Sequence, residues 1–166
     1  MNMSQPARLV MRNTEAPVMK YYDDGGKSGR GNCTWGIGIK AHDGPCSKAE
    51  LARAVTASDV EREFATRVLA AERGVERNVK VELTQAQFDA LVSLTFNVGV
   101  RGASKVYDLL NQGDTSGAAR YIANMTTARQ KRNGKNVQVT LKGLVTRRMA
   151  ESAPFRSQIA VGSASE

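Results

Sequence analysis

The chain has 166 residues, 41% of them hydrophobic, and a formal net charge of +8 from 24 Lys and Arg against 16 Asp and Glu. This length suits one domain, and the hydrophobic content excludes a wholly disordered chain. A basic surface favours an anionic partner, such as nucleic acid, an acidic membrane face or an anionic wall polymer, but charge alone does not choose among them.

The sequence gives no sign of a membrane segment. Residues 1–12 lack the apolar core of a secretory signal peptide. The most apolar stretch, residues 90–100, includes Ser93, Thr95 and Asn97 and is far shorter than the ~20 apolar residues that a bilayer-spanning helix needs. We therefore expect synthesis in the cytoplasm, with no signal peptide and no transmembrane segment.

The front of the chain predicts a short helix followed by a hairpin. Residues 6–15 favour a helix that Pro17 ends, because a residue before proline avoids the helical region. Residues 20–22 and 33–39 are β-prone and flank a glycine-rich turn over 23–32, which is a hairpin signal. A capping box over residues 47–50 predicts a helix that begins at Lys48.

A long helix is expected next. Residues 58–61 (SDVE) form a second capping box, and Val60, Phe64 and Val68 recur on one apolar face of a helix that runs to about Arg77. At 1.5 Å per residue such a helix is ~30 Å long, enough to link two lobes.

The second half reads as helical. Thr84 caps a central core helix with Phe88, Leu91, Val92 and Phe96 on one stripe. Shorter helices are expected over residues 104–112 and 115–124, a polar and basic loop over 126–139, and a last helix over 141–152 capped by Thr140 and followed by an anchoring Phe155. Residues 160–166 are expected to be loose.

Three residues near the hairpin suggest chemistry. Glu15 ends the first helix, Asp24 lies in the turn and Thr34 opens the second strand, and glycosidic bonds are usually cut by two carboxylates. A free Glu with a pKa of ~4.3 is protonated in about one molecule in 500 at pH 7, so Glu15 needs partial burial to act as an acid. Asp24, in a polar turn, stays ionised more easily. Ordinary roles, in a helix end, a turn and a strand, explain the same three residues.

Cys33 and Cys46 leave two alternatives open. They are free thiols in a reducing compartment, or they form a disulfide that closes a short loop in an oxidising one. A zinc site is not expected, because His42 is the only histidine and a set of four ligands from these three residues is incomplete without a carboxylate.

A series of motifs, in order along nearly the whole chain, resembles the phage-type lysozymes, the endolysin class of glycoside hydrolase family 24. The active-site pattern of that family matches Glu15, Tyr22, Asp24, Thr34, Gly36 and Gly38. The central helix of the family is similar to residues 83–93 with 96–99, the next turn to Ser104 with 109–114, and the closing helix to Gly143, Leu144, Arg147, Arg148 and Glu151.

The resemblance implies an α+β, mostly α, lysozyme-like fold in a single domain over residues 1–166. It implies a small N-terminal β-hairpin lobe over about 15–57, a linking helix over about 58–79, and a larger helical lobe over about 80–166 on which residues 1–14 pack. It also implies hydrolysis of the β-1,4 bond between N-acetylmuramic acid and N-acetylglucosamine, without metal or cofactor. By position, Glu15 is the general acid, Asp24 the base and Thr34 a residue that holds the attacking water. The family resembles inverting enzymes, whose carboxyl groups lie ~6.5–9.5 Å apart.

The sequence departs from the family pattern at three places. Ala16 replaces the usual Gly, Ile39 replaces the usual His, and the segment from Asp24 to Thr34 is longer than usual. The longer turn leaves Asp23 as a rival base, although the spacing from Glu15 favours Asp24.

Further residues are candidates for binding. Trp35, Gly38, Ser104 and Tyr107 are candidates for substrate contacts, and Arg148 for a residue that orients Glu15. The basic residues at 129, 131, 132 and 135 favour an anionic wall polymer or a membrane surface, although such runs are usually only solvated. No nucleic-acid-binding motif is present, and we expect a monomer that acts on peptidoglycan glycan strands.

Two other functions remain open. A lytic transglycosylase cleaves the same bond and needs the acid but no water-directing carboxylate, and a non-enzymatic cationic protein would bind wall or membrane. A zinc amidase is excluded by the single histidine. If the resemblance holds, the protein is made in the host cytoplasm and reaches the wall through a holin-type pore.

Overall fold

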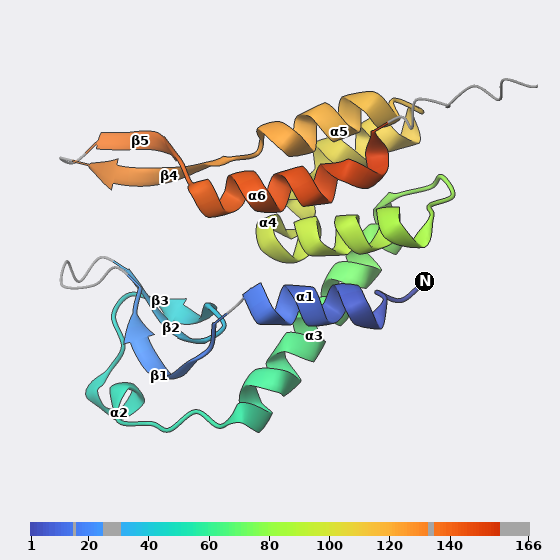
Figure 1. Ribbon diagram of the computed structural model, residues 1–166. Helices are drawn as coiled ribbons and strands as arrows, with labels where there is room; N and C mark the ends of the chain where they lie inside the picture. Colours follow the sequence, from blue (N-terminus) through green and yellow to red (C-terminus); the bar gives the residue numbers. More distant parts are fainter. Residues whose placement is uncertain (15, 25–30, 133–134, 157–166) are drawn as a thin grey trace, which may run out of the picture. The chain divides into compact units, whose positions relative to one another are not determined.

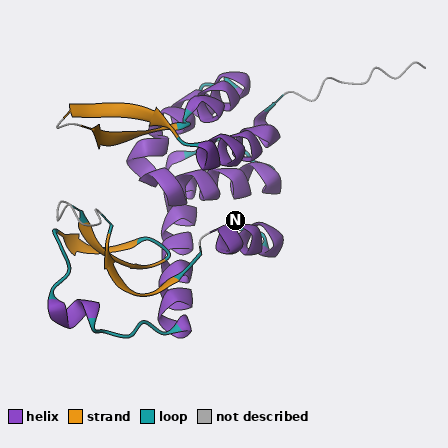
Figure 2. Cartoon of the chain, turned by 60° about the vertical axis from the view of Figure 1, so that its left-hand side comes forward, coloured by secondary structure: helices purple, strands orange, loops and turns teal. Residues whose placement is uncertain are grey.

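The computed structural model describes residues 1–14, 16–24, 31–132 and 135–156. In these ranges the chain is mostly helical, with a three-stranded and a two-stranded antiparallel sheet (Figures 1 and 2). This confirms the predicted α+β, mostly α class. The chain forms two compact units: residues 4–69, called the smaller unit, and residues 1–3 with 70–166, called the larger unit. No helix among the described residues is long and apolar enough to cross a membrane.

The smaller unit contains the predicted hairpin, but with three strands instead of two. Its elements are α1 (Gln5–Thr14), β1 (Val18–Asp23), β2 (Asn32–Gly36), β3 (Ile39–Asp43), α2 (Lys48–Leu51) and the first part of α3. The expected single strand over 33–39 is interrupted because Gly36 and Gly38 adopt φ of 58° and 77°, a region that L side chains avoid. The chain therefore turns back at Ile37, and β3 pairs with β2.

Helix α1 belongs to the smaller unit, whereas residues 1–14 were expected on the larger lobe. The guanidinium groups of Arg8 and Arg12 lie over the ring of Phe64, 5.8 and 6.0 Å from its centre, and Arg12 forms an ion pair with Glu61. These contacts tie α1 to the first half of α3. Only residues 1–3 group with the larger unit, where the N–H of Met3 donates to the buried carboxylate of Glu72.

Helix α3 (Ala57–Asn78) begins one residue before Ser58, the predicted cap. Thr56 is the capping residue: its hydroxyl accepts from the N–H of Asp59 at 3.1 Å, and the Asp59 carboxylate accepts from the hydroxyl and N–H of Thr56. Residues 56–59 (TASD) fit the same capping pattern as 58–61, so the sequence allowed both. The predicted apolar face is confirmed, because Val60, Phe64 and Val68 are buried.

The larger unit is built on one bent helix. Its further elements are α4 (Gln85–Asn111), α5 (Thr115–Asn124), β4 (Thr127–Arg132), β5 (Lys135–Thr140), α6 (Lys142–Ser152) and the 3₁₀ helix η2 (Ala153–Phe155). The predicted capping box at Thr84 is present. The central helix expected after Thr84 and the shorter helix expected over 104–112 form one helix with a kink at Gly99, where φ is 74° and ψ 166°. Of the expected core stripe, Phe88, Leu91 and Val92 are buried and Phe96 is half-buried.

The expectation of a loop over residues 126–139 was wrong. Strands β4 and β5 pair residue for residue from Thr127 with Thr140 to Arg132 with Lys135, and the N–H of Leu141 donates to the Thr126 carbonyl at the base. Within this segment only residues 137–139 (VQV) alternate apolar and polar side chains, and the basic residues of β4 show no period-2 pattern that would have predicted a strand. Thr140 is therefore a strand residue and not the cap of α6, whose N-cap is Leu141.

The reassigned cap of α3 predicts unequal effects of two neighbouring substitutions. Thr56→Ala removes both side-chain hydrogen bonds of the cap and should lower the free energy of unfolding by about 1 kcal/mol. Ser58→Ala alters an exposed helical residue and should change it by less than ~0.5 kcal/mol. Urea denaturation followed by far-UV circular dichroism checks both, and a larger loss for Ser58→Ala would contradict the cap at Thr56.

Candidate active site

Asp24 is held by Asn32 at the end of the hairpin where the turn connects β1 to β2. Its N–H donates to the Asn32 carbonyl at 3.1 Å, and its carboxylate accepts from the Asn32 N–H at 2.5 Å and from the Asn32 side-chain amide at 3.2 Å. Thr34, two residues farther along β2, is buried and pairs across the sheet with Tyr22. The structure thus brings together two of the three residues predicted for catalysis, whereas Glu15 lies outside the described residues.

The contacts of Asp24 favour its ionised form. The backbone N–H of Asn32 is the main cause that lowers the pKa of Asp24, and slight burial opposes it; the Asn32 amide, the Thr34 hydroxyl and the positive charge of Lys40 lower it further. The carboxylate in turn adds to burial in raising the pKa of Tyr22. At neutral pH Asp24 is therefore a carboxylate with lone pairs left to accept a proton or a water hydrogen bond.

Asp23 has a different partner from Asp24. Its carboxylate accepts from the N–H of Cys46 at 2.6 Å. Cys46 is also bonded to Cys33 through a disulfide, with 4.6 Å between the two Cα atoms. Asp23 thus ties the end of β1 to the segment after β3.

Trp35 and Gly38 occupy different environments in the smaller unit. The ring of Trp35 stacks on Tyr21 from β1, with centroids 5.9 Å apart and planes 27° from parallel, and the Arg53 guanidinium lies 5.7 Å from the centre of the Tyr21 ring. Trp35 therefore packs within the sheet. Gly38 is exposed in the turn between β2 and β3.

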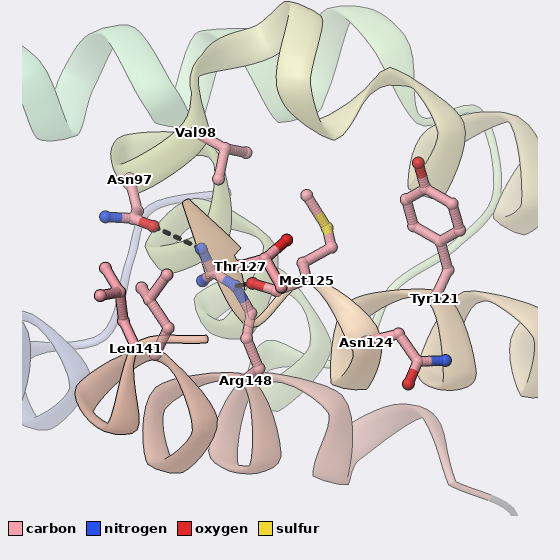
Figure 3. Close-up of a pocket in the computed structure, with 9 residues that line it drawn as sticks. Asn97, Val98, Tyr121, Asn124, Met125, Thr127, Leu141 and Arg148 are labelled. Carbon is pink, nitrogen blue, oxygen red and sulfur yellow. Dashed lines mark hydrogen bonds between the residues drawn. The ribbon is translucent and has the colours of Figure 1, made fainter. Parts of the chain in front are cut away.

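The larger unit contains a pocket of about 640 Å³ between α4, α5 and α6 (Figure 3). It is lined by Asn97, Val98, Tyr121, Asn124, Met125, Thr127, Leu141, Leu144 and Arg148. The lining mixes apolar side chains with amide, hydroxyl and phenol groups, a composition suited to a sugar or a peptide. Of these residues the sequence analysis proposed a role at the site for Arg148 alone, whereas Asn97, Val98 and Leu144 entered it only as parts of helix motifs.

Arg148 organises the wall of this pocket. It is only 1% exposed, and Figure 3 shows it pointing from α6 toward Asn97 and Met125. Its Nε donates to the Met125 carbonyl at 3.1 Å, and its two terminal nitrogens donate to Asn97 Oδ1 and to Glu151. Arg148 therefore fixes the Asn97 side chain. Its suggested role in orienting Glu15 stays a prediction.

The carboxylate of Glu151 forms ion pairs with two arginines, Arg147 and Arg148. Besides Arg148, it accepts from the Ser93 hydroxyl at 2.6 Å and from Arg147 Nε at 3.0 Å, while remaining 4% exposed. Both ion pairs lie on α6, with spacings of i,i+4 for Arg147 and i,i+3 for Arg148.

Ser104 and Tyr107, the other substrate-contact candidates, make internal contacts. The Ser104 hydroxyl donates to the Arg101 carbonyl at 2.9 Å on the surface of α4. Tyr107 is buried, and its hydroxyl bonds to that of Thr95 within the same helix. Its burial raises its pKa, so the phenol stays protonated as part of the core. Because both hydroxyls have internal partners, we do not assign either residue to substrate binding.

Residues 12–151 match the phage lysozyme family. The chain is 31% identical over 159 residues to an endolysin of Acyrthosiphon pisum secondary endosymbiont phage 1, covering 95% of this chain and 99% of that protein. The chain belongs to the phage lysozyme family.

Two solved structures support the lysozyme-like fold. An endolysin from Escherichia coli O157:H7 phage FAHEc1 is 27% identical, with a TM-score of 0.72 over 93% of each chain. The muramidase domain of SpmX from Asticaccaulis excentricus is 28% identical, with a TM-score of 0.69 over 95% of this chain and 99% of that one. The protein is therefore a lysozyme, a glycoside hydrolase that acts on peptidoglycan.

The contacts of Asp24 predict its titration. Carboxyl-detected NMR should give a pKa below 3.8 in the folded protein, and Asn32→Ala should raise it while leaving it below that value, because the stronger backbone bond remains. Ionised Asp24 stabilises the fold above the unfolded pKa of ~3.9, and this contribution is lost as the pH falls through the lower folded pKa. Lys40→Gln is the control: it should raise the pKa of Asp43, whose carboxylate accepts from Lys40 at 2.7 Å, more than that of Asp24.

The buried charge network predicts a large cost for one neutral substitution. Glu151→Gln leaves the Arg148 guanidinium buried without its counter-charge and should lower the free energy of unfolding by about 3–5 kcal/mol. Glu63→Gln, which removes the more exposed i,i+4 pair with Arg67 on α3, should cost at most about 1 kcal/mol. Urea titration of both variants is the measurement, and equal losses would show that burial of the network adds nothing.

Proposed function

We propose that this lysozyme is an endolysin muramidase that hydrolyses the β-1,4 bond between N-acetylmuramic acid and N-acetylglucosamine with inversion. Glu15 protonates the glycosidic oxygen as the bond breaks. Asp24 takes a proton from the water that attacks the anomeric carbon, and the Thr34 hydroxyl helps to hold that water. The reaction balances, because one water molecule is consumed and each of the two new sugar ends carries a hydroxyl group.

The ionised, exposed carboxylate of Asp24 is the observation that carries this proposal. A general base must be deprotonated at working pH and must reach water, and the hydrogen bonds from Asn32 meet the first condition while the exposure of Asp24 meets the second. The competing carboxylate, Asp23, already accepts a hydrogen bond from the backbone of Cys46. These contacts support Asp24 as the base and Asp23 as a structural residue.

We also propose that the pocket in the larger unit binds part of the peptidoglycan substrate. Asn97, Tyr121 and Asn124 supply amide and phenol groups at its lining, and Arg148 fixes the amide of Asn97. The basic residues of the β4–β5 hairpin would add attraction to anionic wall polymer or membrane, which salt screens beyond ~8 Å at physiological ionic strength. The protein would act as a monomer and reach the wall through a holin-type pore.

Substitution of the two carboxyl groups tests the mechanism. Glu15→Gln and Asp24→Asn should each lower turnover on purified wall by about 10²–10⁴-fold, because each removes one proton transfer. Asp23→Asn and Asp43→Asn are matched controls: the first should lower thermal stability and the second should change little, and both should keep turnover within about tenfold. Loss of turnover in Asp23→Asn with full activity in Asp24→Asn would exchange the two roles.

The products distinguish the remaining functions. Mass spectrometry of the released muropeptides should show reducing ends. Ends with a 1,6-anhydro ring, together with tolerance of Asp24→Asn, would instead show a lytic transglycosylase. Equal clearing of wall suspensions by the unchanged chain and by Glu15→Gln would show a non-enzymatic cationic protein.

A further inference from the structure

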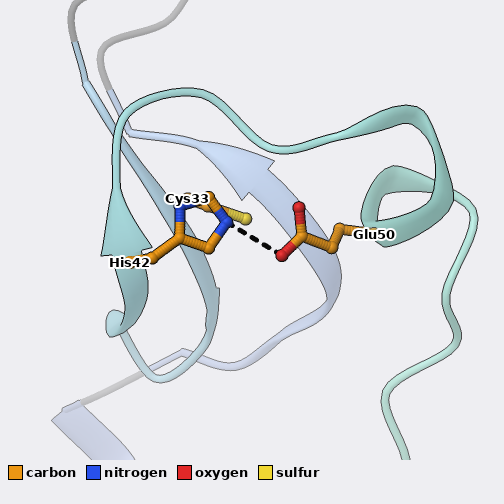
Figure 4. Close-up of side chains that lie close together, drawn as sticks. All are labelled: Cys33, His42 and Glu50. Atoms are coloured by element: carbon orange, nitrogen blue, oxygen red, sulfur yellow. Dashed lines mark hydrogen bonds and ion pairs between the residues drawn. The ribbon is translucent and has the colours of Figure 1, made fainter.

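A group of potential metal ligands gathers around the disulfide of the smaller unit. Cys33 on β2, His42 on β3 and Glu50 on α2 bring a sulfur, an imidazole nitrogen and a carboxylate oxygen within 4.8 Å of one another (Figure 4). Cys46 is bonded to Cys33 and adds a second sulfur. Two sulfurs, one nitrogen and one oxygen are enough for four metal ligands. Glu50 supplies the carboxylate that a zinc site built from the two cysteines and the histidine requires.

The histidine and the glutamate are already oriented by outer contacts. The Oε2 atom of Glu50 accepts from the N–H and the hydroxyl of Ser47, both at 2.7 Å, while its Oε1 lies 2.8 Å from His42 Nε2. His42 Nδ1 lies 3.0 Å from the carbonyl of Asp43. Metal-bound histidines and carboxylates usually have such outer partners, which fix the ring and leave one atom for the metal.

We propose that, when the disulfide is reduced, this cluster binds one Zn²⁺ through the sulfurs of Cys33 and Cys46, Nε2 of His42 and Oε1 of Glu50. Zinc prefers four such ligands in a tetrahedron, with Zn–S of ~2.3 Å and Zn–N and Zn–O of ~2.0–2.2 Å. Two thiolates favour zinc over magnesium and calcium, which take oxygen ligands.

The rearrangement needed for zinc is local. Tetrahedral edges at these bond lengths require the two sulfurs to part to ~3.8 Å and the His42–Glu50 contact to widen to ~3.4 Å. Both changes call for side-chain rotation. The Cys33 sulfur, the His42 nitrogen and the Glu50 oxygen already lie within 4.8 Å of one another, and Cys46 Sγ, which is bonded to Cys33 Sγ, turns toward them once the disulfide is open. The side chains of His42 and Glu50 are 42% and 27% exposed, so an ion can enter from solvent.

The reduction balances with a thiol co-reactant. Two electrons and two protons from a dithiol convert the Cys33–Cys46 disulfide to two thiols, and the dithiol becomes a disulfide. Zinc then displaces both thiol protons, and the Nε2 proton when the imidazole is cationic, into solvent. Zinc and the disulfide therefore exclude each other, and each closes the loop between residues 33 and 46.

The biological role of this zinc site rests on the proposed function, whereas zinc binding itself does not. A chain made in a reducing cytoplasm and acting outside it would hold its hairpin with zinc before release and with the disulfide afterwards.

A zinc titration of the full chain tests the site. The chain is freed of metal and divided into an oxidised sample and a sample reduced with a phosphine under anaerobic conditions, and ZnCl₂ is added in competition with a chromophoric chelator. We expect one zinc per reduced chain, none per oxidised chain, and at least ~10-fold slower alkylation of both thiols when zinc is present. Equal binding by the two samples, or no binding by the reduced one, would overturn the proposal.

Variants identify the ligands. His42→Ala and Glu50→Gln should each weaken zinc binding to the reduced chain by at least ~10-fold, whereas Asp43→Asn, a neighbouring exposed acid outside the cluster, should not. Circular dichroism and wall hydrolysis of the oxidised variants test whether they fold. A folded variant that binds zinc weakly has lost a ligand and not its structure. Unchanged affinity in His42→Ala and Glu50→Gln would mean that the four-ligand site does not exist.

Discussion

The smaller unit depends on a double closure between the end of β1, β2 and the segment after β3. The Cys33–Cys46 disulfide closes a loop with a sequence separation of 13, and a loop of that size removes unfolded-state entropy equivalent to about 3 kcal/mol in the chain-entropy description. The hydrogen bond from Cys46 N–H to Asp23 adds a second link between the same segments. The carboxylate of Asp24, the next residue, accepts instead from the N–H and the side-chain amide of Asn32. The two neighbouring carboxylates therefore have separate partners: Asp23 links the end of β1 to Cys46, and Asn32 favours the ionised form of Asp24.

Much of the fold could be predicted from local sequence patterns. The incorrect predictions of helix and strand bounds arise where a local pattern allows more than one structure. Helices with one clear start, such as those after Ser47 and Thr84, were predicted to the residue because a capping box specifies the first turn. Where two boxes overlapped, the sequence allowed both starts and only the structure shows that Thr56 caps α3. The kink at Gly99 and the turn at residues 36–38 depend on positive φ at glycines, which composition permits but does not require.

The candidate site was predictable only in part. Spacing and resemblance selected Asp24 and Thr34, but nothing in the sequence indicated that Asn32 would supply both the backbone and the side-chain donors. Arg148 was noticed as a charge on α6, yet its burial against Asn97 and the Met125 carbonyl depends on three elements far apart in the chain. Local patterns predict which residues are available for a site, whereas long-range packing decides which of them meet.

The β4–β5 hairpin has its base beside the pocket of the larger unit and extends away from α5 and α6 (Figure 1). Thr127 and Leu141, at the base of this hairpin, both line that pocket, while residues 128–132 pair with residues 135–139 farther out. Residues added or lost near the tip would change the reach of the hairpin and leave the pocket lining in place. The length of the hairpin and the lining of the pocket can therefore be changed independently, which makes this hairpin a natural site for grafting peptides onto this lysozyme.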